Sequence, residues 1–256
     1  MTSKPPTPSD ELVHVPHAPL TAYYQKEEDR SEFLREIFDK TAVDYDRIEK
    51  AMAFGSGSWY RHQALLRAGL AKGMKVADVG IGTGLVAREA ASIIGDPTLI
   101  TGIDPSAGMM NAGKLPAGIT LLNGRAESIP LPDASVEFLS MGYALRHISD
   151  LSVAFTEFAR VLKPGGRFCV LEITKPRTRL GTLALKTYMR TVVPIIAWVV
   201  AKEPATRTMW RYYWDTIEAC APPAGVVATL EGAGLVEVVR HVELGIFSEY
   251  QGRKAL

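Results

Sequence analysis

A glycine-rich turn carries the strongest chemical signal in the sequence. The segment 76–84, VADVGIGTG, runs from an apolar stretch through Asp78 into glycines at 80, 82 and 84, after which a helical pattern begins. Glycine has no Cβ atom, so such a turn lets the backbone approach a ligand closely. A dinucleotide-binding turn would need a glycine at the sixth position, where Leu85 stands, and a P-loop would need Lys followed by Ser or Thr. The spacing instead favours a nucleoside with a small zwitterionic tail.

An acidic residue follows the next apolar stretch. Asp104 comes 20 residues after Gly84, and a carboxylate at the end of a second strand can accept hydrogen bonds from both ribose hydroxyls. The alternative interpretation is a tight turn with a helix cap, because the segment 104–106, Asp-Pro-Ser, also resembles the start of a helix.

Polar side chains also follow the third and fourth apolar stretches. Arg125 and Glu127 lie in the segment 124–127, where main-chain groups could meet an adenine edge, while Glu127 could equally be a solvated loop charge. Arg146 and His147 end the segment 142–147, GYALRH. An Arg beside a His just past a strand end is a catalytic candidate, although a surface Arg and a capping His are the alternative.

The elements that must position these residues are short and alternate along the chain. Apolar runs followed by turn residues predict five buried strands, over residues 75–79, 99–103, 119–123, 136–141 and 167–173. Helical patterns lie between them, over residues 85–95, 107–115 and 151–162, and the segment 163–166, Lys-Pro-Gly-Gly, ends the last one. Repeated strand–helix units predict an α/β fold with a parallel sheet and helices on both faces.

Helical regions flank this alternating core. Residues 26–70 predict two or three helices with a break at 55–58, and these would cover an edge or the open end of the sheet. Residues 180–214 predict a helical cap, kinked at Pro194 and rich in Trp, Tyr and Met. A helix over 224–234 and a terminal pair of strands, 235–244 and 246–249, complete the chain.

Composition limits the class of protein. The chain has 256 residues, with 29 Lys and Arg against 28 Asp and Glu, so no global field favours a nucleic-acid partner. Cys169 and Cys220 form neither a disulfide framework nor a metal-binding pattern, which fits a reducing cytoplasm and predicts no metal site. Residues 1–25 are expected to form a disordered tail without a signal peptide. The longest uncharged apolar run, 191–201, is shorter than a spanning helix, so we expect a soluble or surface-attached protein.

The sequence resembles the class I S-adenosylmethionine-dependent methyltransferases, and more narrowly the ubiquinone/menaquinone biosynthesis C-methyltransferase family. The resemblance covers residues 33–176 and is carried by the glycine turn, Asp104 and the blocks ALRHISD and VLKPGGRFCVLEITKP. It implies a Rossmann-like fold with a seven-stranded, mostly parallel sheet and an antiparallel terminal hairpin. It also implies a single methyltransferase domain over residues 26–256, with an N-terminal helical cover (26–70) and a helical cap insertion (177–222).

The resemblance further implies S-adenosylmethionine as the cofactor. The implied cofactor-binding residues are Asp78, Gly80, Gly82, Thr83, Gly84, Asp104, Pro105, Arg125, Ala126 and Gly142. The chain departs from the family's pattern at His147, where Asn usually follows the Arg, and at Arg125, where Asn is common. Residues 180–256 match poorly. These departures fall near the expected acceptor pocket.

The leading hypothesis is methyl transfer to a ring carbon of a phenolic or hydroquinone acceptor with a lipid-like tail. Arg146, with a pKa above ~12, stays protonated and cannot take the hydroxyl proton, so it is expected to stabilise the phenolate or to position a water. His147, with an ordinary pKa of ~6.5, is expected to take that proton. Tyr45 is expected to reach the acceptor hydroxyl, with a packed aromatic role as the equal alternative.

Two other functions stay open at this point. The first is methyl transfer to another acceptor, such as a phospholipid amine or a polyketide phenol. The second is a catalytically silent protein that only binds S-adenosylmethionine. Residues 180–214 are expected to form a movable apolar cap that admits a lipid-like acceptor, with peripheral contact at the inner membrane surface. The alternatives for this segment are a homodimer interface or a simple cover of the sheet.

Overall fold

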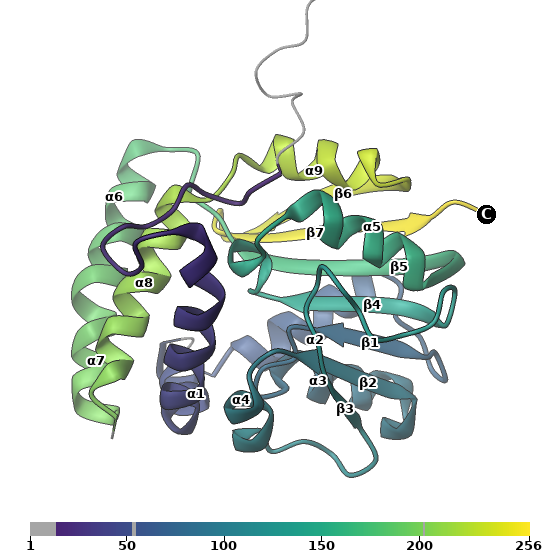
Figure 1. Ribbon diagram of the computed structural model, residues 1–256, viewed down its shortest axis with the longest axis horizontal. Coiled ribbons are helices and arrows are strands. Elements are labelled where there is room, and N and C mark those ends of the chain that lie inside the picture. The colour runs from purple at the N-terminus through teal and green to yellow at the C-terminus, as the bar shows by residue number, and fades with distance from the viewer. Residues whose placement is uncertain (1–13, 53–54, 202) are drawn as a thin grey trace, which may run out of the picture.

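A seven-stranded sheet forms the centre of the chain. The computed structural model describes residues 14–52, 55–201 and 203–256 (Figure 1). The strands lie in the order β3-β2-β1-β4-β5-β7-β6, with β1 to β5 parallel and β7 antiparallel to both neighbours. Their bounds are β1 Val76–Val79, β2 Ile100–Asp104, β3 Thr120–Asn123, β4 Val136–Gly142, β5 Leu162–Ile173, β6 Leu235–Glu243 and β7 Phe247–Lys254. The predicted Rossmann-like sheet with an antiparallel terminal pair is therefore confirmed.

The strand order places a ligand site at one edge of the sheet. β1 lies between β2 and β4, so the chain reverses its direction of winding at β1. In open α/β sheets, ligands bind outside the carboxyl ends of the strands at such a reversal. The glycine turn follows β1 directly, and Asp104 is the last residue of β2.

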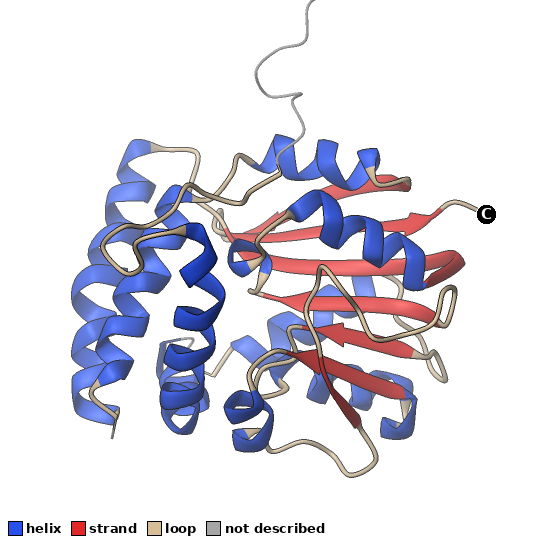
Figure 2. Cartoon of the chain, viewed as in Figure 1, coloured by secondary structure: helices blue, strands red, loops and turns tan. Residues whose placement is uncertain are grey.

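Helices cover both faces of the sheet (Figure 2). On one face, α5 (Leu151–Val161) and α9 (Pro223–Gly232) bury Phe155, Phe158 and Leu230 against the strands. On the other face, α2 (Gly57–Arg67) and α3 (Leu85–Ile94) bury Leu65 and Ala90. The short α4 (Ala107–Ala112) follows β2. Apolar spacing in these helices matches the period of a helix with one buried stripe.

A separate layer of helices stands beside the carboxyl ends of the parallel strands (Figure 1). It contains α1 (Glu27–Met52), α6 (Arg179–Thr187), a π-helical turn η3 (Tyr188–Val192), α7 (Val193–Val200) and α8 (Ala205–Ala219). These helices share a core that includes Ile48, Met189, Val193, Trp210 and Trp214. Of the predicted N-terminal helices, α1 joins the predicted cap in one layer over the ligand edge, whereas α2 packs on a face of the sheet.

Several elements differ from their predictions, and β7 extends to Lys254 instead of residue 249. β5 begins at Leu162 and includes the Lys-Pro-Gly-Gly segment, because a register shift against β4 accommodates the Pro and the glycines in the strand. α4 ends at Ala112 instead of residue 115, since Gly113 leaves the helical conformation. Pro194 lies in the first turn of α7, where a missing N–H costs little. The chain leaves the helix only after Val200, and α8 continues past Trp214 to Ala219.

The structure also corrects the expected tail. Residues 14–24 lie against the domain as a strap, although the prediction placed all of 1–25 in disorder. The His14 carbonyl accepts a hydrogen bond from Leu151 N at 2.6 Å, and the Pro16 carbonyl accepts one from Ala221 N at 2.6 Å. Tyr23 donates to Asp215 at 2.6 Å. Composition misses the strap because a polar, Pro-rich segment gives no periodic pattern for the two backbone carbonyls and the buried His17 and Tyr24 that hold it. Residues 1–13 lie outside the described residues.

Candidate functional site

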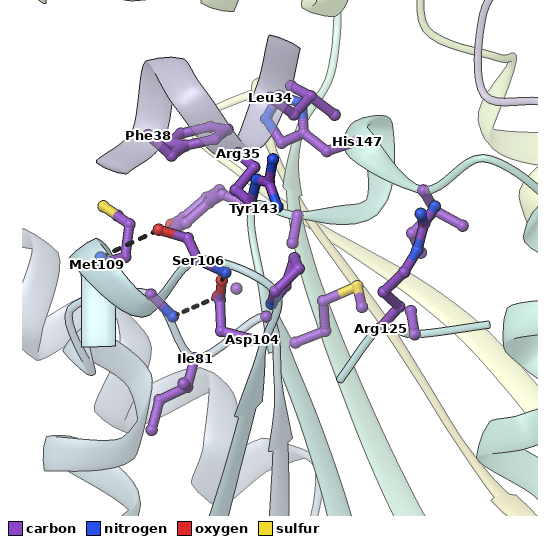
Figure 3. A pocket seen from close by; sticks show the side chains of 18 of the residues that line it. Leu34, Arg35, Phe38, Ile81, Asp104, Ser106, Met109, Arg125, Tyr143 and His147 are labelled. Carbon is purple, nitrogen blue, oxygen red and sulfur yellow. Dashed lines mark hydrogen bonds between the residues drawn. The ribbon is translucent and has the colours of Figure 1, made fainter. Parts of the chain in front are cut away.

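A cavity of about 520 Å³ lies at the carboxyl ends of β1, β2 and β4, beneath α1 (Figure 3). Predicted site residues that line it are Tyr45, Gly80, Gly82, Thr83, Asp104, Pro105, Arg125, Ala126, Gly142 and His147. Three further predicted residues do not line it, namely Asp78, Gly84 and Arg146. Figure 3 shows Leu34, Arg35 and Phe38 of α1 across this space from Asp104. The cavity therefore joins the glycine turn to the helical layer.

The glycine turn forms the floor of the cavity, at positions where larger residues would clash with their neighbours. Gly80 and Gly82 have φ angles of 71° and 53°, which side chains rarely adopt. A Cβ atom on Gly80 would lie 2.8 Å from Cβ of Ala144, and one on Gly142 would lie 2.5 Å from Val86. Gly84 is instead the residue that begins α3, so its role is to turn the chain. The floor leaves backbone groups close to any bound molecule.

Asp104 presents a carboxylate at the end of β2. Its Oδ2 accepts a hydrogen bond from Gly82 N and its Oδ1 accepts one from Ser106 N, each at 2.8 Å. Each oxygen keeps a further lone pair for a ligand hydroxyl. Burial raises the pKa of Asp104 to about 6. The residue that caps α4 is Ser106 and not Asp104, since Ser106 Oγ accepts the hydrogen bond from Met109 N.

Asp78 lies beneath the turn and not in the cavity wall. Its Oδ1 accepts a hydrogen bond from Ser140 Oγ at 2.7 Å. Burial, together with the nearby Asp104, raises the pKa of Asp78 to about 7. This carboxyl group supports the turn from below, so any effect on a ligand acts through the backbone of the turn.

Two acidic residues of α1, which the sequence analysis missed, hold this helix over the cavity. Asp46 accepts hydrogen bonds from Thr83 Oγ1 and from Arg88. Asp39 accepts from Ser106 Oγ and from Gly108 N, the latter at 2.8 Å. The two acids lie seven residues apart and therefore on one helix face. That spacing is a signal that could have identified them.

The loop after β3 is fixed by side-chain hydrogen bonds. Arg125 donates to Ser31 Oγ at 2.7 Å and to Ser149 Oγ at 2.9 Å. Glu127 accepts from Ser149 N at 2.6 Å, so it connects two loops and is not a solvated charge. Arg125 and Ala126 thus line the cavity from a well-supported loop.

His147 lines the far end of the cavity with a buried ring (Figure 3). Among the described residues, neither ring nitrogen has a hydrogen-bond partner. The ring packs edge-on against Phe38, with centroids 5.3 Å apart, and stacks on Tyr212 at 5.7 Å. Burial, followed by the positive charge of Arg146, lowers the pKa of His147 well below its usual value. The imidazole is therefore neutral around pH 7.

Arg146 lies behind the cavity wall and not in it. Its guanidinium is fully buried, forms an ion pair with Glu172 and lies 3.8 Å from the ring centre of Tyr213. Burial opposes the charged form, yet Glu172 raises the pKa of Arg146, so the group is a fixed cation. Tyr213 lines the cavity, and the charge of Arg146 reaches a ligand only across this ring.

Tyrosines and a second Arg complete this end of the cavity. The hydroxyls of Tyr45 and Tyr213 lie 3.4 Å apart, and burial raises the pKa of Tyr45 well above its usual value. Tyr143, in the wall, has a φ of 60°, which is an unusual conformation for a bulky residue. Arg61 Cζ lies 5.7 Å from the Tyr143 ring centre, and its guanidinium is ion-paired with Glu49.

These last residues differ in how far the sequence could identify them. Tyr143 stands in the post-strand segment already selected, whereas Arg61 lies on a helix whose orientation the sequence does not fix. Arg61 and Tyr143 both line the cavity. Across the described residues, no cluster of three or more His, Cys, Asp or Glu could hold a metal ion. The cavity thus has a carboxylate at one end and an unpaired imidazole, phenolic hydroxyls and a cation at the other.

Comparison with protein families gives one extended match. The model of the ubiE/COQ5 methyltransferase family matches residues 24–254. A demethylmenaquinone methyltransferase from Symbiobacterium thermophilum is 34% identical over 183 residues, which cover 68% of this chain and 72% of that protein. The ubiquinone/menaquinone biosynthesis C-methyltransferase UbiE from Geotalea daltonii is 31% identical, covering 88% of this chain and 98% of that protein.

Solved structures show the same fold at lower identity. A SAM-dependent methyltransferase from Thermotoga maritima superposes with a TM-score of 0.60 at 21% identity, covering 86% of this chain and 99% of that chain. Human N-acetylserotonin methyltransferase, solved in complex with SAM, superposes with a TM-score of 0.53 at 18% identity, covering 92% of this chain and 59% of that chain. At these identities the likeness concerns the fold.

Proposed function

The chain belongs to the ubiE/COQ5 methyltransferase family and is an S-adenosylmethionine-dependent methyltransferase, and from this premise we propose that it methylates a ring carbon of a hydroquinone with a lipid-like tail. The observation that carries the acceptor side of the proposal is His147, a buried imidazole without a hydrogen-bond partner among the described residues, in the cavity wall. Buried polar groups normally have a hydrogen-bond partner. The two ring nitrogens of His147 have none among the described residues, which favours a ligand hydroxyl as their partner.

The donor end of the cavity fits S-adenosylmethionine. The glycine turn lines the cavity with backbone alone, because a side chain at Gly80 or Gly142 would clash with its neighbours, and Asp104 keeps lone pairs for the two ribose hydroxyls. Arg125 and Ala126 stand where an adenine edge would lie. When bound, the cofactor supplies a methyl group already activated on a sulfonium. The protein must then align the acceptor, exclude water and manage one hydroxyl proton.

The acceptor end of the cavity offers one group that can accept that proton and others that can donate hydrogen bonds to the phenolate. A phenol ring becomes a better carbon nucleophile as its hydroxyl proton leaves. His147 is neutral at working pH, so one ring nitrogen can accept a hydrogen bond from the acceptor hydroxyl while the other can donate one. Its lowered pKa makes it a weak base, so the proton passes to it only as neighbouring donors and cations lower the pKa of the acceptor hydroxyl. Burial raises the pKa of Tyr45 and Tyr143, and these hydroxyls therefore remain donors toward a developing phenolate.

Arg61 replaces Arg146 as the cation that faces the phenolate in this proposal. Both guanidinium groups are ion-paired, Arg61 with Glu49 and Arg146 with Glu172. Arg61, however, lines the cavity beside Tyr143 and its Nε has no hydrogen-bond partner among the described residues, whereas Arg146 lies behind the wall against the ring of Tyr213. Arg146 is then a positioning residue that holds Tyr213 and, through its charge, keeps His147 neutral.

The proposal is tested by turnover of a water-soluble, short-chain hydroquinone with S-adenosylmethionine. Mass spectrometry and NMR of the product separate carbon from oxygen methylation. His147→Ala should lower kcat by about 10²–10⁴-fold without changing cofactor affinity, as loss of a proton acceptor does. His147→Asn, which places the family's usual residue here, separates hydrogen bonding from proton transfer. Wild-type activity in His147→Ala, or no turnover of any hydroquinone or phenol, would overturn the proposal.

The proposed cellular location follows from the cysteine content of the chain. Cys169 is buried and Cys220 is half-buried, and both are free thiols. A reducing cytoplasm remains the prediction from this cysteine content. A carbonate-washed membrane fraction compared with the soluble fraction, in cells that express the chain, would test it.

A further inference from the structure

The outermost helices of the helical layer are apolar on two opposite faces. The stretch Arg179–Val200, made of α6, the π-helical turn and α7, has 22 residues and is the one described helix long and apolar enough to cross a membrane, judged by length and composition alone. Its inner face buries Met189, Val193 and Ala197 against α1 and α8. A segment held this way by the domain core does not cross a bilayer.

The outer face of this stretch is apolar as well. Its large side chains that are 60–80% exposed are Leu180, Leu183, Ile195, Trp198 and Val199. Helix α8 in the same layer presents Arg207, Thr208 and Arg211 to solvent, as a surface helix normally does. Thr187, Arg190 and Thr191 are exposed in the middle of the stretch, whereas α7 (Val193–Val200) carries no polar side chain. A helix that is apolar all round, as α7 is, is expected to be covered on both sides. The outer face of Arg179–Val200 therefore requires an apolar partner.

Cations border this apolar face. Arg177 and Arg179 stand at its start and are exposed, and neither takes part in any ion pair among the described residues. A groove between α6 and the tip of the β6–β7 hairpin is lined by Lys175, Arg177, Arg240 and His241, and the described lining contains no acidic residue. Leu244, 80% exposed, stands at the same groove. The partner that matches these features is apolar inside and anionic at its surface.

We propose that the outer face of Arg179–Val200, with the hairpin tip at Leu244, docks in the plane of an anionic lipid bilayer. Trp198 is suited to the headgroup region, and the Arg and Lys side chains at the groove suit lipid phosphates. A second copy of the chain fits less well, because a symmetric contact would bring the same cations toward each other. This docking extends the proposed function, since a lipid-tailed acceptor would be drawn from that bilayer.

Vesicle co-sedimentation of the full chain tests the docking. We expect sedimentation with vesicles of phosphatidylcholine mixed with phosphatidylglycerol, and much weaker sedimentation with phosphatidylcholine alone or at high salt. The double variant Trp198→Gln/Val199→Gln should lose about tenfold or more of its vesicle affinity. The matched control is Trp59→Gln/Val43→Gln, which changes the same residue types at sites 64% exposed on α2 and α1 and should bind as the wild type does.

The other outcomes show whether a bilayer or a second copy of the chain covers the outer face of Arg179–Val200. Equal vesicle binding by the two double variants, or none by the wild type, overturns the proposal. A wild-type dimer in light scattering that becomes a monomer in Trp198→Gln/Val199→Gln, without vesicle binding by either, assigns the face to a second copy. Methylation of the short-chain hydroquinone should be unchanged in Trp198→Gln/Val199→Gln. Failure of that reaction in the wild type would count against the proposed function and leave the vesicle result intact.

Discussion

Burial shifts the pKa values of the titratable groups at the two ends of the cavity in opposite directions. The pKa of Asp104 is raised to about 6, and the pKa of His147 is lowered well below its usual value. Both shifts favour the neutral form, but only Asp104 changes its charge near physiological pH. We therefore expect cofactor binding to depend on pH in a range where proton acceptance at His147 does not.

Asp104→Asn should weaken S-adenosylmethionine binding by about tenfold or more, because a carboxylate that accepts two ribose hydroxyls is replaced by an amide that accepts on one side only, at ~1–3 kcal/mol. In the wild type, affinity should be level above pH 7 and should fall as the pH drops through about 6, since protonation removes an acceptor. Calorimetry measures both effects. Asp133→Asn, at an exposed site, is the control, and unchanged affinity in Asp104→Asn would refute the assignment.

Arg61→Gln should lower kcat while the affinity for S-adenosylmethionine stays within about twofold, because the guanidinium acts on the acceptor and its loss removes a transition-state contact. The rise of kcat with pH should also move to higher pH, since a hydroxyl near a cation ionises more readily than one without it. Steady-state kinetics from pH 6 to 9 measure both. Weaker cofactor binding with an unshifted profile would instead assign Arg61 to the cofactor's carboxylate.

At the scale of elements, the core was predictable and its edges were not. Strands β1, β2 and β4 were predictable because strands buried on both faces form continuous apolar runs. The prediction that all five strands are buried was wrong for β3, which lies at the edge of the sheet and is largely exposed. The start of β5 was not, because Pro-Gly-Gly usually ends an element and here a register shift accommodates it. The glycine turn and Asp104 are local in sequence, whereas Arg61 and Asp46 reach the site only through helix orientation. Composition also missed the strap, whose contacts combine backbone carbonyls with isolated His and Tyr side chains.

Helix α1 closes the cavity through Asp39 and Asp46, and this contact can be tested separately. Asp46→Asn removes the charge that accepts hydrogen bonds from Thr83 and Arg88, so α1 should open more often and its amides should exchange hydrogen faster. S-adenosylmethionine affinity should fall several-fold as the turn loses its support. Glu36→Gln, an exposed change on the same helix, is the control. Equal exchange in the two variants would show that Asp46 does not hold the helix.

For the whole molecule, two raised carboxyl pKa values make stability depend on pH. Asp78, at about 7, and Asp104, at about 6, bind protons more tightly in the folded chain than in the unfolded chain, where an Asp titrates near 3.8. Their contribution to stability is therefore fully present below that value and is lost as the pH rises through about 6 and about 7. The charged forms are the ones that burial penalises.

Asp78→Asn should consequently stabilise the protein more, or destabilise it less, at pH 8 than at pH 5. The variant removes a buried negative charge that is present only at the higher pH. Urea denaturation at both pH values measures the difference. Asp133→Asn should show no such difference, since its carboxylate is exposed. If both variants respond alike, the Asp78 carboxyl does not titrate in this range.

The two halves of the cavity come from different parts of the chain. Residues 76–142 build the donor half, while α1 and α8, from the two ends of the chain, bring Tyr45 and Tyr213 to the acceptor half. The strap at 14–24 joins these ends to the core through Leu151 and Ala221. His147 and Tyr143, which follow β4, complete the acceptor half, so the terminal helices shape the acceptor space around a centrally encoded imidazole. Exchange of the terminal segments between relatives can produce new substrate ranges, while the central segment keeps the same methyl donor.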